Sequence, residues 1–118
     1  MSSSFEDLKV WQRSCDLTIK LYKLLKNWKD YGLKDQILRA AVSIPSNIAE
    51  GSERKSVADF SHFLNIAKGS AAELRTQVYI AQQVELLGTD ESTKIINELK
   101  EISKMLQGLA TSLSRTGN

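Results

Sequence analysis

Cysteine, proline and histidine are scarce in this 118-residue sequence, which has one of each, and glycine occurs only six times. The single cysteine, Cys15, excludes an internal disulfide bond and is typical of a reducing compartment. Few glycines and prolines leave little room for long irregular segments. No apolar run approaches the roughly 20 residues of a transmembrane helix, and the start, MSSSFEDLKVW, lacks the pattern of a signal peptide. These absences predict a cytoplasmic protein that does not enter the membrane.

The length and composition predict one globular domain over residues 1–118, with a single core. Apolar residues make up 42% of the chain and charged residues 25%, both ordinary values. The formal net charge is only +2, but residues 1–34 hold seven basic and four acidic groups. The positive excess therefore lies in the first third of the chain.

Apolar periodicity and breaking residues predict four helices, at about 6–28, 33–51, 56–87 and 90–113. Ser56 is a suitable N-cap for the third helix, and Gly88 a suitable end. Connections of a few residues make neighbouring helices antiparallel, so the expected fold is an all-α, up-down-up-down four-helix bundle. Nothing in the sequence has the alternating pattern of a β-strand.

The first predicted helix has two apolar seams. Together they cover an arc of about 220° around the helix axis, whereas the apolar arc of a surface helix is roughly 100°. One bundle core cannot bury so wide an arc, and a large exposed apolar patch usually marks an interface. We therefore expect one seam to face another subunit; the alternative is a merely apolar surface. One seam is Leu8, Trp11, Cys15, Ile19 and Tyr22; the other, assigned to the subunit interface, is Val10, Leu17, Leu21, Leu24 and Trp28.

A basic stripe follows the remaining arc of the same helix, through Lys9, Arg13, Lys20 and Lys23. Taken alone, such a stripe is most simply a solvated face. Lysine and arginine in register along a helix can also neutralise the phosphates of a nucleic acid. Repeated around an oligomer, the stripe would produce a much stronger field. Lys26 falls on the apolar side and has no role in this scheme.

The segment SIPSNIAEGSE, residues 43–53, places a proline inside the second predicted helix. The apolar phase does not slip at Pro45, which predicts a helix that continues through it, with Pro45 opposite the core face. Proline has no backbone N–H, so the carbonyl of Ala41 loses its partner and the helix bends. Ser43 or Ser46 is the expected substitute donor.

Polar residues flank the apolar faces of the second and third predicted helices, and we expect them to hydrogen-bond between helices as a buried network. A di-iron site is disfavoured because a bundle site of that kind uses Glu-x-x-His motifs, and His62 belongs to none. No catalytic residue, metal or cofactor is therefore assigned. The network residues are Gln36, Arg39, Ser43, Asn47, Glu50, Ser70, Glu73 and Gln77.

Three segments together resemble the 23S rRNA intervening-sequence proteins: FEDLKVWQRSCDL, DQILRAAVSIPSNIAEGSERKS and FSHFLNIAKGSAAELRTQ. The resemblance spans essentially the whole chain, although relatives often have Phe-Pro where this chain has Asn27-Trp28. It implies an antiparallel four-helix bundle that forms a ring-shaped homopentamer without enzymatic activity. A similar protein, the accessory variability determinant of diversity-generating retroelements, binds nucleic acid and a reverse transcriptase.

Two functions follow as hypotheses. The first is a non-enzymatic homo-oligomer that binds RNA or DNA through its repeated basic stripes, with little sequence readout. The second is a scaffold for a protein partner, such as a polymerase or a ribosomal component, without direct nucleic-acid binding. The weak total charge favours the second, because the pI of 8.7 is below the value of about 9 that marks many nucleic-acid binders.

Overall fold

The computed structural model describes residues 4–116, with side chains as far as residue 115. A 3₁₀ turn, η1 (Phe5–Asp7), precedes four helices: α1 (Lys9–Leu24), α2 (Tyr31–Ser52), α3 (Val57–Gln83) and α4 (Thr89–Thr116). Within residues 4–116 there is no β-strand. The all-α, four-helix prediction is confirmed.

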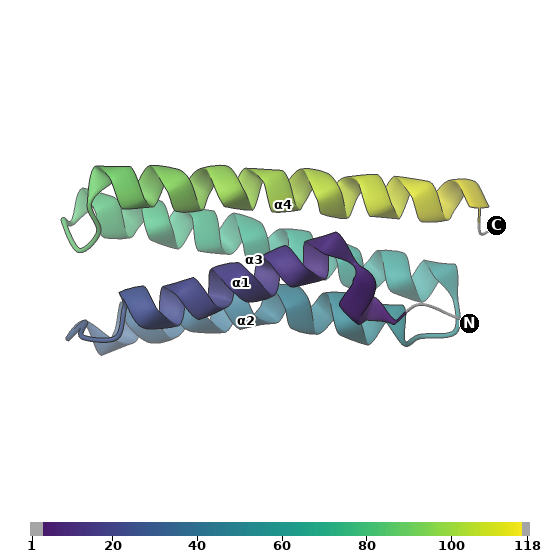
Figure 1. The fold of residues 1–118 in the computed structure, drawn as a ribbon, viewed down its shortest axis with the longest axis horizontal. Helices are drawn as coiled ribbons and strands as arrows, with labels where there is room; N and C mark the ends of the chain where they lie inside the picture. The colour runs from purple at the N-terminus through teal and green to yellow at the C-terminus, as the bar shows by residue number, and fades with distance from the viewer. Residues whose placement is uncertain (1–3, 117–118) are drawn as a thin grey trace.

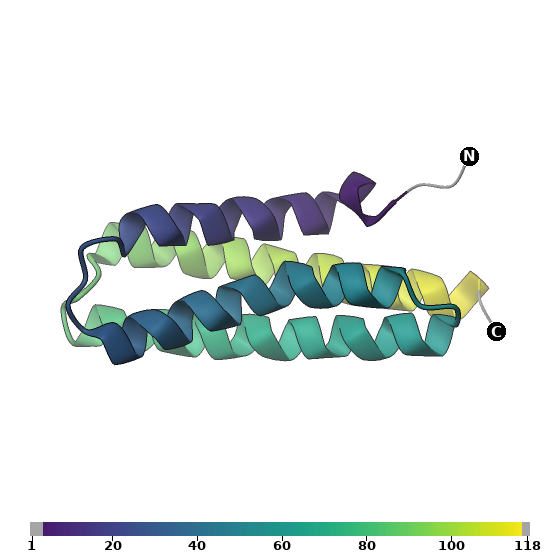
Figure 2. The same ribbon diagram turned by 90° about the horizontal axis from the view of Figure 1, so that it is seen from below.

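The helices form an elongated antiparallel bundle of 47 × 20 × 20 Å (Figures 1 and 2). The α1–α2 and α3–α4 connections lie at one end, and the start of η1 and the end of α4 lie at the other. Helix α1 packs mainly on α2 and only lightly on α4. The side of α1 that faces α4 is therefore the place where side chains can line a groove.

Branched aliphatic side chains from all four helices fill the core. Large buried side chains account for most of the favourable free energy of folding, at roughly 1.5–3 kcal/mol each. Those that are less than 2% exposed are Leu21, Leu25, Ile37, Ile44, Ile48, Leu64, Leu74, Val78, Ile95, Leu99, Ile102 and Leu106.

Two helices are shorter than their apolar patterns predicted. Helix α1 begins only after Leu8, whose extended backbone separates it from η1, and ends at Leu24 instead of residue 28. Helix α3 ends at Gln83, because Glu85 adopts a left-handed φ of 65°. The Leu86 N–H then donates to Ala81 O at 2.8 Å, a Schellman closure. The end predicted at Gly88 is therefore wrong.

Side-chain caps fix the beginnings of the two central helices. The Asp30 carboxylate accepts a hydrogen bond from Leu33 N at 3.0 Å, so α2 starts at Tyr31 and not near Leu33. Ser56 caps α3 by accepting from Asp59 N at 3.0 Å, as its position predicted.

Helix α2 continues through Pro45, as predicted, but Pro45 is buried and does not lie opposite the core. Because α2 packs against both α1 and α3, its buried arc is wider than one apolar face. The donor for Ala41 O is Thr18 of α1, whose Oγ1 lies 3.2 Å away and also 2.8 Å from Ser14 O. The substitute donor therefore comes from another helix, and neither Ser43 nor Ser46 fills this role.

Gly51 allows the end of α2 to approach the start of α3 closely. A Cβ at this position would lie 2.7 Å from Phe63 Cβ and 3.0 Å from Phe60 Cδ1. Such distances are shorter than non-bonded carbon atoms tolerate, so no larger residue fits without a shift of the helices.

Candidate nucleic-acid interface

Two ion pairs join the basic stripe of α1 to α4. Arg13 donates from Nε to Glu98 Oε2 at 2.9 Å and from Nη2 to Oε1 at 2.5 Å, a bidentate pair. One heptad further along, Lys20 Nζ lies 3.6 Å from Glu91 Oε1. The hydrogen bond to Glu98 raises the pKa of Arg13 above its ordinary value, so the guanidinium stays charged.

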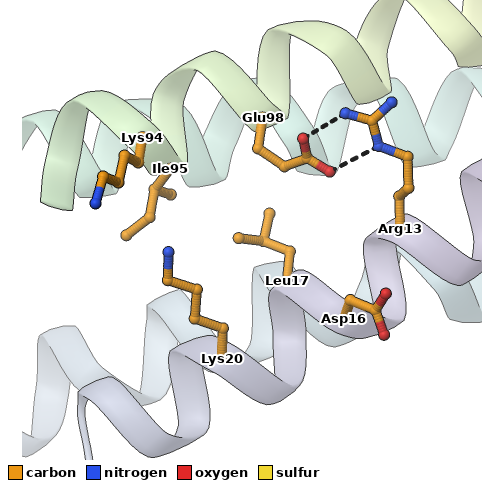
Figure 3. Close-up of a pocket in the computed structure, with 7 residues that line it drawn as sticks. All are labelled: Arg13, Asp16, Leu17, Lys20, Lys94, Ile95 and Glu98. Atoms are coloured by element: carbon orange, nitrogen blue, oxygen red, sulfur yellow. Dashed lines mark hydrogen bonds and ion pairs between the residues drawn. The ribbon is translucent and has the colours of Figure 1, made fainter.

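The two ion pairs flank a groove of about 450 Å³ between α1 and α4 (Figure 3). Its apolar floor is Leu17 and Ile95, both buried. Figure 3 shows Lys20 and Lys94 reaching into the same end of the groove from opposite helices. The charged residues that line it are Arg13, Lys20 and Lys94 against Asp16 and Glu98.

The charges of this groove nearly cancel, because Glu91 adds a third carboxylate beside Lys20. Arg13 and Lys20 already have carboxylate partners and would have to exchange or share them to bind a phosphate. Lys9 and Lys23 are exposed and make no ion pair within residues 4–115. Of the four cations of the predicted stripe, the structure thus leaves two available to an anion.

Further unpaired lysines lie where α1 ends and α2 begins. Residues 20–34 contain five lysines and one acidic residue, Asp30, which is occupied in capping α2. Lys34 Nζ donates to Lys26 O at 3.2 Å and so stabilises the carbonyl end of α1. We call Lys23, Lys26, Lys29 and Lys34 the lysine-rich corner.

The sequence interpretation missed most of this corner because it assumed that the first helix extended to residue 28. Lys26 lies two residues beyond Leu24, the last residue of α1. It is exposed and does not belong to the apolar side of the helix. The local charge count in residues 20–34 was the signal that could have identified the corner.

The predicted interhelix network is much smaller than expected. Ser43 Oγ and Ser70 Oγ lie 2.8 Å apart across α2 and α3, and Asn47 Nδ2 donates to Ser43 Oγ at 2.9 Å. These three residues are the part that the structure brings together. Of these hydrogen bonds, the one between Ser43 and Ser70 joins α2 to α3, and the one from Asn47 lies within α2.

The other five network residues form ion pairs within their own helix or have no hydrogen-bond partner in the described chain. Arg39 pairs with Asp35 at 2.8 Å, and Glu50 with Arg54 at 2.9 Å, each within one helix. Two are exposed without a hydrogen bond in the described chain, Gln36 and Glu73. Gln77 is 6% exposed, yet its buried Oε1 has no partner among the described residues.

The seam assigned to the subunit interface lies instead in the core of the single chain. Val10, Leu17 and Leu21 are 4%, 5% and 0% exposed, and Leu24 and Trp28 pack against the core half-buried. The buried arc of α1 consists of the first three of these residues together with two small polar residues, Ser14 and Thr18. The interface assignment is therefore wrong for Val10, Leu17 and Leu21, whereas for the half-buried Leu24 and Trp28 it stays a prediction.

The exposed apolar residues of α1 belong to the other seam. Ile19 and Tyr22 are each 52% exposed. Cys15 of that seam is half-buried, and burial raises the pKa of its thiol, which makes it a poor nucleophile. Neither it nor His62, which packs edge-on to Phe63, belongs to a cluster of three metal-binding side chains within the described residues.

Comparison with known proteins gives the family. The profile of the 23S rRNA-intervening sequence proteins matches residues 6–108. The chain belongs to this family. A similar solved structure is a protein of unknown function from the S23 ribosomal protein family of Bacteroides thetaiotaomicron VPI-5482. It has 30% sequence identity and a TM-score of 0.81, and the match covers 86% of this chain and 97% of that one.

The fold implied by the resemblance is thus shown by sequence and by structure. No curated protein matches the chain. None of the helices in the described part of the chain is long and apolar enough to span a membrane.

Proposed function

We propose that this family member is a non-enzymatic, cytoplasmic homo-oligomer that binds nucleic acid through its phosphate backbone. The observation that carries the proposal is the lysine-rich corner. Three of its four cations, Lys23, Lys26 and Lys29, are exposed and have no carboxylate partner among the described residues. Unpaired surface lysines attract phosphates by displacing condensed counterions, without reading the base sequence.

This proposal moves the contact surface along α1, compared with the stripe that the sequence predicted. Lys23 is common to both surfaces. Lys9 lies at the opposite end of α1 and is at most an outlying contact. Arg13 and Lys20 already pair with Glu98 and Glu91 of α4, so the proposal does not rely on them for phosphate contacts.

Self-association is supported by a second surface, on α3 and the residue that follows it. Ile66, Ile80 and Val84 are 38%, 45% and 57% exposed. Their spacings of 14 and 18 residues are close to whole helical turns, so they share one side of α3. An apolar side of this kind suits contact with another copy, and the family resemblance implies five copies in a ring.

The nucleic-acid proposal is tested by neutralising the corner. We expect Lys23→Gln/Lys26→Gln/Lys29→Gln to bind a structured RNA at least ten-fold more weakly at low salt. The slope of log affinity against log salt should fall by about 2 to 3, since each phosphate contact contributes about 0.7–0.9. Fluorescence anisotropy across a salt series measures both quantities.

The matched control removes the same charge from α4. Lys94→Gln/Lys100→Gln/Lys104→Gln takes away three lysines outside the corner and should leave the salt slope nearly unchanged. Equal losses in the two triple variants would show that only total charge matters, and would contradict the corner. Wild-type protein that binds neither RNA nor DNA at low salt would favour the scaffold function, for which the exposed apolar side of α3 is the supporting observation.

A further inference from the structure

Two of the most exposed large apolar side chains in the described chain are tyrosines beside the lysine-rich corner. Tyr31, the first residue of α2, is 69% exposed, and Tyr22 in the last turns of α1 is 52% exposed. Neither makes a ring contact with another aromatic side chain within residues 4–115. Lysine contacts with a phosphate backbone leave these exposed aromatic rings without a role.

The two rings border two adjoining hollows on α2, and Tyr22 of α1 lines the second of them. A shallow hollow of about 560 Å³ is lined by Tyr31, Lys34, Asp35 and Leu38, together with Gly32. A second, of about 440 Å³, adjoins it and shares Asp35 and Leu38. The residues that complete the second hollow are Tyr22, Arg39, Val42 and Ser43.

The charge of this surface suits a polyanion. Asp35 is the only carboxylate that lines either hollow, and Arg39 Nε holds it at 2.8 Å. Lys34 lines the first hollow, and Lys23 and Lys26 are close in sequence to Tyr22. Cations for phosphates and flat apolar rings for bases therefore occur together.

We propose that Tyr22 and Tyr31 form a stacking platform that makes this protein prefer single-stranded nucleic acid over a duplex. The inference rests on the proposed nucleic-acid function and adds the class of ligand. Bases of a single strand are free to stack on aromatic rings, and every base has a flat face, so the preference does not depend on sequence. Bases inside a duplex are already stacked on one another and cannot use the platform.

The experiment compares a short unstructured RNA strand with the same sequence as a duplex, using the full-length protein. Tyr22→Leu/Tyr31→Leu keeps the apolar character but removes the rings, and it should weaken single-strand binding at least ten-fold, given the usual contribution of one to two stacked bases. Duplex affinity should change less than two-fold. Tyr22→Phe/Tyr31→Phe should retain single-strand affinity, because the rings remain.

Two controls separate this inference from the proposed function. Tyr79→Leu removes a 56%-exposed ring on α3 and should have no effect. Unchanged single-strand affinity in the double leucine variant, with loss in the lysine triple variant, would overturn the platform and leave the proposed function standing. A changed solution mass in the double leucine variant would assign the tyrosines to self-contact and also overturn it. Absence of any binding by wild-type protein would overturn both.

Discussion

At the scale of single residues, the clearest feature is a backbone hydrogen bond that is replaced from another helix. Pro45 cannot donate to Ala41 O, and the Thr18 hydroxyl of α1 lies 3.2 Å from that oxygen. The sequence predicts that the carbonyl is left without its partner, since that follows from proline chemistry. It does not predict Thr18, because the donor is 23 residues away and depends on how α1 packs on α2.

We expect Thr18→Val to lower the free energy of unfolding by about 1–3 kcal/mol, since valine keeps the shape but leaves a buried carbonyl unpaired. Pro45→Ala restores a backbone N–H at the same carbonyl. In that background Thr18→Val should cost at least about 1 kcal/mol less. Urea unfolding of the four proteins of this cycle measures the coupling. Equal costs in both backgrounds would show that Thr18 acts only through Ser14 O or through packing.

At the scale of helices, number, order and direction follow from sequence, whereas the ends of α1 and α3 do not. Apolar periodicity continues past Leu24 and Gln83, but the helical conformation ends at these residues. Periodicity alone does not predict these ends. Glu85 adopts a left-handed φ although it is not glycine, so the residue type did not predict the end of α3. The caps at Ser56 and Asp30 are local, and Ser56 was predicted because capping depends on the next few residues alone.

The contact between α2 and α3 is expected to be sensitive to one added methyl group. Gly51→Ala would place a Cβ 2.7 Å from Phe63 Cβ, and we expect a loss of about 1–3 kcal/mol in unfolding free energy from overpacking. Gly69→Ala is the matched control, because a Cβ there meets nothing within 4 Å. Alanine at position 69 should instead stabilise the protein by about 0.5–1 kcal/mol through helix propensity. Stabilisation by both substitutions would show that the helices can separate at Gly51 without loss.

At the scale of the whole molecule, the sequence indicated an excess of apolar surface but placed it on the wrong residues. Two seams on α1 differ by a rotation of the helix, and amphipathicity alone does not say which one faces the core. Packing on α2, where the Thr18 hydroxyl contacts Ala41 O, decides it, and Leu21 is completely buried. The carboxylate partners of Arg13 and Lys20 in the basic stripe were not predicted either, because they are on α4, more than 70 residues away in sequence.

We expect the proposed self-association through α3 to depend on Ile80. Ile80→Asp places a charge on the apolar side and should convert the oligomer largely to monomer, without altering the helical content. Asn97→Asp adds the same charge to an exposed position on α4 and should leave the oligomer intact. Light scattering coupled to size-exclusion chromatography gives both masses. An oligomer that persists in Ile80→Asp would place the subunit contact elsewhere.

The start of η1 and the end of α4 lie at the end of the bundle opposite the α1–α2 connection, along its 47 Å axis (Figure 1). A tether attached to either terminus would therefore hold the protein on a sensor surface with the lysines and tyrosines directed into solution. Fluorophores attached at either terminus would label the protein without touching the contact surface. The bundle thus offers two interchangeable attachment points that leave the proposed nucleic-acid interface unobstructed.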